Sequence, residues 1–248
     1  MKEKGGKGVG ASLRRKEDRR HLHGRGQFVS DIRLPGTLEV AFVRSAVAHG
    51  TIKSIHVPGG KVFTARDFPD LKPIVAVTKI EGFKYSEHPA LASERVRFAG
   101  EAIAMAVGAT RGEAEDVADA VVVEIDELPA VVDMLDALKP GAPLVREEWG
   151  DNVFVKRENA YGDVEAARRN AAVTVTREYR MNRQSAVPLE GRAILAEWNH
   201  RLEELTVYTG SQSPHQTRVG LAQVLGLEER QLRLISPDMG GGFGSKRV

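Results

Sequence analysis

The stretch Pro237-Asp238-Met239-Gly240-Gly241-Gly242-Phe243-Gly244-Ser245-Lys246 places four glycines within five positions, near the last residue of the 248-residue chain. Glycine readily adopts positive φ angles, which turn successive backbone N–H groups toward one point. A loop with so few side chains also lets a ligand approach the backbone closely, which suits an anion or a polar ring system. The alternative for a lone glycine-rich loop is a tight turn between two elements.

The order of residues in this loop excludes two phosphate-binding motifs. The P-loop requires Gly-Lys-Ser/Thr, whereas this chain has Gly244-Ser245-Lys246. The dinucleotide fingerprint, counted from Gly240 and Gly242, requires a third glycine where Ser245 stands. A second group of glycines, at residues 5–10, follows only four residues. No strand can lead into it, so we interpret it as a flexible tail.

A helix flanked by strands is predicted just before the loop. Ser213 is a good N-cap, Pro214 suits the first helical position, and Gln216 completes a capping box. Gly226 suits the C′ position that ends the helix. The expected flanking strands cover residues 205–208 and begin again at Leu232.

Three polar residues near this helix are candidates for chemistry. Gln212 lies between the strand end and the helix N-terminus, where its amide can both donate and accept hydrogen bonds. A cap or loop role is the plainer alternative. We interpret Glu190 as the partner of a nearby arginine and His215 as a surface or loop-packing residue. No pair of carboxylates suggests acid–base catalysis, and no metal-ligand spacing is present.

The N-terminal half is expected to form a self-contained α+β unit. Thr110 and Glu113 make a capping box for a helix with an apolar stripe. The expected strands of this unit cover residues 38–44, 101–107 and 121–125.

Two prolines and a glycine at residues 137–143 indicate a domain boundary. In the second unit, Val173, Val175 and Tyr179 alternate with polar residues and predict a half-exposed strand. Residues 192–198 are expected to be its neighbour in a hairpin or sheet. The expected divisions are a basic mobile arm at 1–23, a domain at 24–136, a linker at 137–150 and an incomplete domain at 151–248.

Charge is unevenly distributed along the chain. Residues 1–25 hold nine Lys/Arg and three Asp/Glu, a balance of +6, which leaves −4 for the remainder of a chain with net charge +2. A basic arm can bind nucleic acid or an acidic partner. Aromatic interleaving and nucleic-acid motifs are both missing. We therefore expect no nucleic-acid partner and interpret the arm as a solvated or partner-docked tail.

The absence of cysteine excludes disulfides, iron–sulfur ligation and thiolate zinc sites in this chain. No apolar run is long enough to span a bilayer, and the N-terminus has no apolar core of a signal peptide. We expect a cytoplasmic protein without a membrane span.

Taken together, these stretches resemble the xanthine dehydrogenase/aldehyde oxidase/carbon monoxide dehydrogenase large-subunit family. The resemblance runs in order along nearly the whole chain, and its most specific part is the glycine loop combined with Gln212-Ser213-Pro214-His215. It implies an α+β fold, with an α/β hammerhead domain followed by the first part of a molybdenum-cofactor-binding domain. Other stretches that carry it are 15–20, 24–28, 43–49, 96–101, 128–132 and 188–192.

The resemblance also implies a cofactor. Family members carry molybdenum on a molybdopterin, usually the cytosine dinucleotide form in bacteria. Gln212 would then form a hydrogen bond near the oxo ligand of the metal or to the pterin, and no residue of this chain would ligate the metal directly. The residues that would line the cofactor through their backbone are Gly241, Gly242, Phe243 and Gly244.

Family members continue beyond the glycine loop, and the continuation carries the substrate pocket and the glutamate base. We therefore assign no catalytic residue here, and we expect a second polypeptide to carry the rest. Partner subunits would hold the iron–sulfur clusters and FAD. The complete enzyme would oxidise an aldehyde, an N-heterocycle or carbon monoxide with water as oxygen source, and this chain alone would be inactive. The alternatives are a non-catalytic truncated subunit or module that docks on an iron–sulfur partner, and a stand-alone nucleotide or phosphate binder.

Overall fold

The computed structural model describes residues 8–76 and 78–247. These residues form two compact units, which we name by their contents. The glycine-loop unit comprises residues 8–34, 185–222 and 227–247, and the three-sheet unit comprises residues 35–184 with 223–226. The predicted mobile arm, residues 1–23, falls partly on residues 1–7, which lie outside the described residues.

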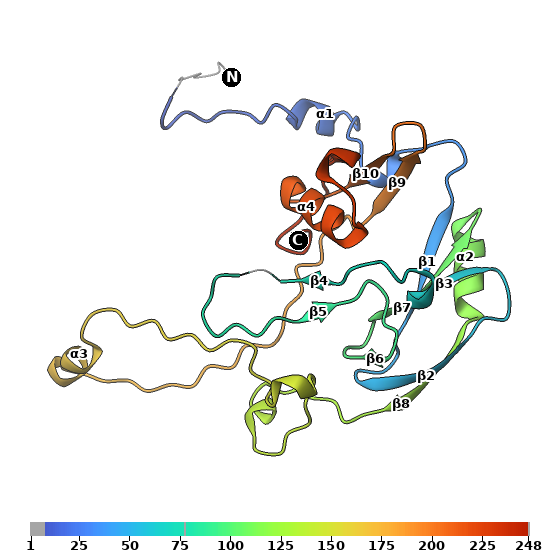
Figure 1. The fold of residues 1–248 in the computed structure, drawn as a ribbon. Coiled ribbons are helices and arrows are strands. Elements are labelled where there is room, and N and C mark those ends of the chain that lie inside the picture. The colour runs from blue at the N-terminus through green and yellow to red at the C-terminus, as the bar shows by residue number, and fades with distance from the viewer. Residues whose placement is uncertain (1–7, 77, 248) are drawn as a thin grey trace. The chain divides into compact units, whose positions relative to one another are not determined.

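The three-sheet unit contains two three-stranded antiparallel sheets and a short two-stranded one (Figure 1). In the first sheet, β7 lies between β1 and β3. In the second, β2 lies between β6 and β8, and β4 pairs with β5. The strands are β1 (Glu39–Arg44), β2 (Gly50–His56), β3 (Lys61–Thr64), β4 (Ile74–Val75), β5 (Glu87–His88), β6 (Arg95–Val96), β7 (Ala102–Gly108) and β8 (Val122–Glu127).

The core of this unit forms around the second sheet, because its apolar side chains alternate with polar ones. Ala92, Val96 and Ile103 are fully buried or nearly so. The partly buried residues packed against them are Val47, Ile52, Ile55, Val123 and Ile125. The predicted strands at 38–44, 101–107 and 121–125 are confirmed as β1, β7 and β8.

Helix α2 (Arg111–Asp119) follows β7 and packs on the first sheet. Its capping box is confirmed, since Thr110 Oγ1 accepts from the Glu113 N–H at 3.2 Å. In return, the Glu113 carboxylate accepts from the Thr110 N–H at 3.2 Å. Ala114 and Ala118 lie on the buried face, as the apolar stripe predicts.

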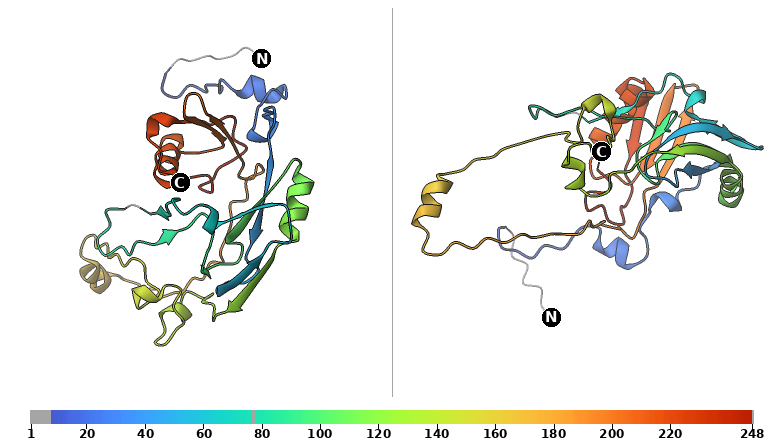
Figure 2. Two further views of the ribbon diagram at one scale, coloured as in Figure 1. Left: turned by 45° about the vertical axis from the view of Figure 1, so that its right-hand side comes forward. Right: turned by 90° about the horizontal axis from the view of Figure 1, so that it is seen from below.

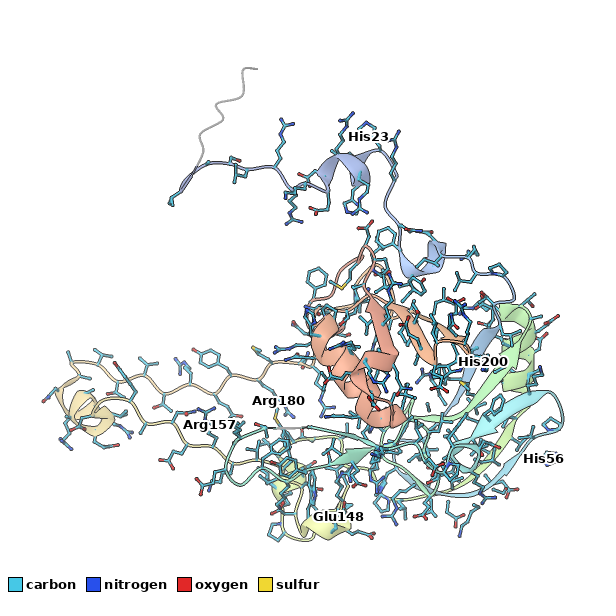
Figure 3. The ribbon with its side chains drawn as sticks, turned by 45° about the horizontal axis from the view of Figure 1, so that its top comes forward. His23, His56, Glu148, Arg157, Arg180 and His200 are labelled. Atoms are coloured by element: carbon cyan, nitrogen blue, oxygen red, sulfur yellow. The ribbon has the colours of Figure 1, made fainter. Side chains whose placement is uncertain are left out.

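An extended arm, residues 155–184, leaves the rest of the three-sheet unit and returns to it. Helix α3 (Val164–Asn170), capped by the Asp163 carboxylate, lies at its tip (Figure 1). Figure 3 labels Arg157 and Arg180 on its two limbs. The strand predicted over Val173–Tyr179 is wrong: the residues from 171 to 188 belong to no strand, and Tyr179 is 86% exposed.

The glycine-loop unit contains one three-stranded sheet and two helices. Its strands are β9 (Ile194–Asn199), β10 (Glu204–Thr209) and β11 (Leu232–Ile235), with β10 in the centre, antiparallel to β9 and parallel to β11. The sheet neighbour expected for residues 192–198 was the 173–179 segment, and the structure corrects this. β9 pairs instead with β10, the strand that follows it after a short loop at residues 200–203.

Helix α4 (Pro214–Leu225), orange-red in Figure 2, follows β10 and precedes β11 along the chain. Gly226 ends it with φ at +67°, and the Leu227 N–H donates to Ala222 O at 2.9 Å, which confirms the predicted C′ glycine. Ser213 stands at the predicted N-cap position, since its carbonyl accepts from the Thr217 N–H at 3.0 Å. The side-chain capping bond is absent, because Ser213 Oγ is buried without a hydrogen-bond partner among the described residues.

The remaining helices are short. They are α1 (Asp18–Leu22) and the single 3-10 turns η1 (Val29–Asp31), η2 (Ala65–Asp67), η3 (Asp136–Leu138), η4 (Glu147–Trp149) and η5 (Glu229–Gln231). Across the described ranges, no helix has both the length and the apolar character needed to cross a bilayer.

Candidate functional site

The glycine loop follows β11 and combines a turn with an unusual backbone conformation. Gly241, Phe243 and Gly244 all have positive φ, at +102°, +48° and +90°. The left-handed region is unfavourable for a residue with a side chain, so neighbouring hydrogen bonds must hold Phe243 there. The turn is closed by Ser245, whose N–H and hydroxyl both donate to Gly242 O, at 2.8 and 2.7 Å.

Gln212 holds the loop from inside the glycine-loop unit. Its side-chain Oε1 accepts from the Gly244 N–H at 2.9 Å, and its backbone N–H donates to Lys246 O at 3.0 Å. A Cβ at Gly242 would lie 2.6 Å from Gln212 Cδ, so only glycine fits there. The Gln212 Nε2 amide donates to no residue in the described ranges, which leaves this donor available to a ligand.

Glu190 binds both ends of the loop. Its Oε2 accepts from the Gly240 N–H at 2.8 Å and from Lys246 Nζ at 2.6 Å. The Glu190 N–H also donates to Gly240 O at 3.2 Å. The side chains of Glu190 and Lys246 are 15% and 1% exposed. The predicted salt bridge of Glu190 is confirmed, but its partner is Lys246 from the loop rather than an arginine.

Asp238, just before the loop, binds the N-terminal segment. Its N–H donates to Gln27 O at 3.0 Å, and its Oδ2 accepts from the Gln27 N–H at 2.8 Å. Arg20 lies 2.5 Å from Oδ1, and the Asp238 side chain is 9% exposed. The Gln27 N–H is the main cause that lowers the pKa of Asp238, and the positive charge of Arg20 acts in the same direction.

Three successive backbone N–H groups in the loop have no hydrogen-bond partner among the residues that the structure describes. The N–H groups of Gly241, Gly242 and Phe243 donate to no residue within the described ranges. Gly240 and Gly244, on either side, are both bound, to Glu190 and Gln212. The loop therefore presents a short row of fixed donors, which can bind an anion or the polar edge of a ring system.

Every predicted site residue lies on this loop or beside it. Gln212 contacts Gly242 and Gly244 directly; Phe243 lies between these two residues, and Gly241 precedes them. His215 is exposed in the first turn of α4. The sequence interpretation missed Lys246 as the partner of Glu190 and missed the contacts of Asp238. The only local signal was that both residues belong to the quoted loop stretch.

Ser211 is another residue that the sequence interpretation missed. Its buried hydroxyl lies 2.8 Å from Thr217 Oγ1 and accepts from the Ser213 N–H. Ser236 Oγ accepts from the Ser211 N–H at 3.3 Å. These bonds fix the backbone on both sides of Gln212, and the Ser-x-Ser spacing was their sequence signal.

Comparison with protein families divides the chain into two matched segments. Residues 23–129 match the family described as "Aldehyde oxidase and xanthine dehydrogenase, a/b hammerhead domain". Residues 145–248 match the family described as "Molybdopterin cofactor-binding domain". The glycine loop, Gln212 and Glu190 all fall within the second segment.

Curated relatives match along nearly the whole chain. It is 36% identical to the carbon monoxide dehydrogenase large chain of Hydrogenophaga pseudoflava, over 93% of this chain and 31% of that protein. It is 35% identical to the nicotine 6-hydroxylase large subunit of Paenarthrobacter nicotinovorans, over 96% of this chain and 30% of that subunit. The chain thus spans about a third of the length of these relatives.

A solved structure agrees with the sequence comparisons. Quinoline 2-oxidoreductase from Pseudomonas putida 86 superposes with a TM-score of 0.88 at 35% identity, covering 95% of this chain and 31% of that one. The hammerhead segment and the cofactor-domain segment occur here in the same chain and in the order that the resemblance implies. The chain belongs to the xanthine dehydrogenase, aldehyde oxidase and carbon monoxide dehydrogenase large-subunit family of molybdenum hydroxylases.

Proposed function

We propose that this chain supplies the hammerhead domain and one wall of the molybdopterin site of a molybdenum hydroxylase. The observation that carries the proposal is the row of N–H groups at Gly241, Gly242 and Phe243, which have no acceptor within residues 8–76 and 78–247, in a loop held by Gln212. When bound, the cofactor would supply the redox chemistry that oxidises an aldehyde, an N-heterocycle or carbon monoxide, with water as the source of oxygen.

The loop fits an anionic metal-oxo or pterin group for a specific reason. The Cβ position of Gly242 is filled by the Gln212 side chain, so the amide packs directly against the loop backbone. The free donors are fixed before any ligand arrives, so binding would cost little reorganisation. Gln212 Nε2 would donate toward the oxo ligand or the pterin. Gly244 would contribute through its position, because its N–H is bound to Gln212.

The other components of the proposed enzyme follow from the relatives. They are named as large chains or large subunits, and this chain spans about a third of their length. We propose that a further polypeptide segment carries the rest of the cofactor domain, including the glutamate base. The cofactor would be the cytosine dinucleotide form, and separate subunits would hold the iron–sulfur clusters and FAD.

The test replaces the residues that hold the free donors. The chain is co-expressed with the neighbouring genes for the proposed partners, and molybdenum and pterin are measured per chain. Gln212→Ala and Gly242→Ala should each lower both contents about 10-fold, as loss of a supporting contact does at metal sites. Gly112→Ala is the matched control, because a Cβ there meets open space. Unchanged contents in the Gln212 and Gly242 variants would refute the assigned roles.

The same preparations separate the alternative functions. A non-catalytic module that docks on an iron–sulfur partner would copurify with that partner and contain neither molybdenum nor pterin. A stand-alone nucleotide or phosphate binder would show a rise in melting temperature when nucleotides are titrated into the chain alone. We expect no such rise.

A further inference from the structure

We infer that Glu190 is the positioning residue of the glycine loop, holding its two ends together so that the free N–H groups between them keep their direction. The inference rests on the proposed function, because it concerns how this loop would present those donors to the molybdopterin. Glu190 would not touch the cofactor itself. It would act through Gly240 and Lys246.

One carboxylate oxygen makes both contacts. Glu190 Oε2 lies 2.8 Å from the Gly240 nitrogen and 2.6 Å from Lys246 Nζ. These two residues are the first and last of the loop, 240–246, so the oxygen closes the loop into a ring. The backbone adds a second bond at the first end, from the Glu190 N–H to Gly240 O at 3.2 Å.

Glu190 packs closely against the start of the loop. A Cβ on Gly240 would lie 2.5 Å from Glu190 Cβ, so the two backbones are in close contact. The Lys246 ammonium group is buried, with its side chain 1% exposed, and Glu190 is the acid that pairs with it. Removing one partner of a buried ion pair strongly destabilises the folded protein, because the other charge is left uncompensated. The carboxylate and the ammonium group therefore hold each other in place.

Gln212 completes the attachment at a third point. It binds Gly244 through its side chain and Lys246 O through its backbone. The loop is thus bound at residues 240, 244 and 246, while the N–H groups at 241–243 have no acceptor in the described part of the chain. The direction of those donors depends on the bonds at either side of them. Of these, the bonds to Glu190 are the only side-chain bonds that hold the first end within the described residues.

The test uses two double variants that differ only at residue 190. In Glu190→Gln/Lys246→Met, no buried charge remains, and the glutamine carbonyl can still accept from the Gly240 N–H. In Glu190→Ala/Lys246→Met, no buried charge remains either, but that acceptor is lost. Amide hydrogen exchange of Gly240 is measured in the full chain without cofactor. Molybdenum and pterin contents are measured in the assembled complex. Glu228→Gln, which removes the exposed pair with Arg230, is the matched control.

We expect the alanine variant to exchange the Gly240 amide at least about 10-fold faster and to hold about 10-fold less molybdenum and pterin. The glutamine variant should restore both to near the wild-type values. Equal loading of the two double variants would overturn the inference, whatever their melting temperatures. If the wild-type complex itself contains no molybdenum, the proposed function fails, and the Gly240 exchange rates alone decide whether Glu190 positions the loop.

Discussion

Gly242 and Gln212 are thirty residues apart in the sequence and in direct contact in the structure, so the glycine at 242 makes room for the glutamine side chain. The Gln212 amide fills the space that a Cβ at Gly242 would need, and its Oε1 binds the next residue but one, Gly244. The glycine-rich pattern by itself was compatible with a simple turn, and the loop does contain one, closed by Ser245. The contact with Gln212 is what adds a set of fixed, unused donors to that turn.

Single residues were predictable where the signal was local. The position of Gln212 between a strand and a helix was evident from the sequence, and so was the ion pair of Glu190. The identity of its partner was not, because Lys246 lies 56 residues further along the chain. A long lysine side chain reaches back from the loop end, and no spacing rule encodes such a contact. The same holds for Asp238 and Gln27, which are 211 residues apart.

Asp238 gives a pH-dependent prediction at the residue scale. Its pKa is lower in the folded chain than the ordinary value of 3.8, first because it accepts from the Gln27 N–H. A lowered carboxyl pKa stabilises the fold above pH 3.8, and this contribution is lost as the pH falls through the lower folded-state pKa. Asp238→Asn should therefore lose less of its free energy of unfolding than the wild type between about pH 6 and pH 3.

Urea denaturation at several pH values in that range measures the effect. Asp70→Asn, at an exposed carboxylate in the other unit, is the control. If wild type and Asp238→Asn lose the same free energy on acidification, the contact with Gln27 does not contribute to stability.

At the scale of elements, prediction succeeded where a segment carries its own start and stop signals. The capping box of α2 and the terminal glycine of α4 are examples, because each involves residues a few positions apart. The Val173–Tyr179 segment failed because alternation indicates only that one face is apolar. A strand also needs a neighbour with which to exchange hydrogen bonds. β9, the strand expected to be its neighbour, pairs with β10 instead.

The α2 cap gives a prediction of stability. Thr110→Ala removes the side-chain acceptor for the Glu113 N–H and should lower the free energy of unfolding by about 1 kcal/mol. Thermal or urea denaturation measures it. Thr110→Ser keeps the hydroxyl and should stay close to wild type. A loss of the same size in both variants would show that the hydroxyl is not the cause.

The extended arm predicts where proteases cut the three-sheet unit. Residues 171–188 form no strand, and the arm exposes Tyr161, Val173 and Tyr179. Brief trypsin treatment should cleave this unit first at Arg157 or Arg177, because an extended exposed chain fits a protease without local unfolding. Arg111 is a built-in comparison: its side chain is 81% exposed, but it lies in α2. If mass spectrometry shows that Arg111 is cleaved before the arginines of the arm, the prediction is contradicted.

At the scale of the whole molecule, the order of segments along the chain differs from their grouping in space. Residues 8–34 belong to the same compact unit as 185–222 and 227–247. The contacts of Gln27 and Arg20 with Asp238 account for part of this grouping. Composition indicated a boundary at 137–143, but it carries no information about which distant segments pair. The family resemblance supplied the two-domain order, and the family matches at 23–129 and 145–248 agree with it.

The central claim is that this loop forms one wall of a molybdopterin site, in a chain that spans about a third of its relatives' length. The most direct test is the ratio of molybdenum to chain in the complex purified through a tag on this chain. Our account predicts about one molybdenum and one pterin per chain, as expected for a single cofactor site. A fully assembled complex that contains neither would contradict it.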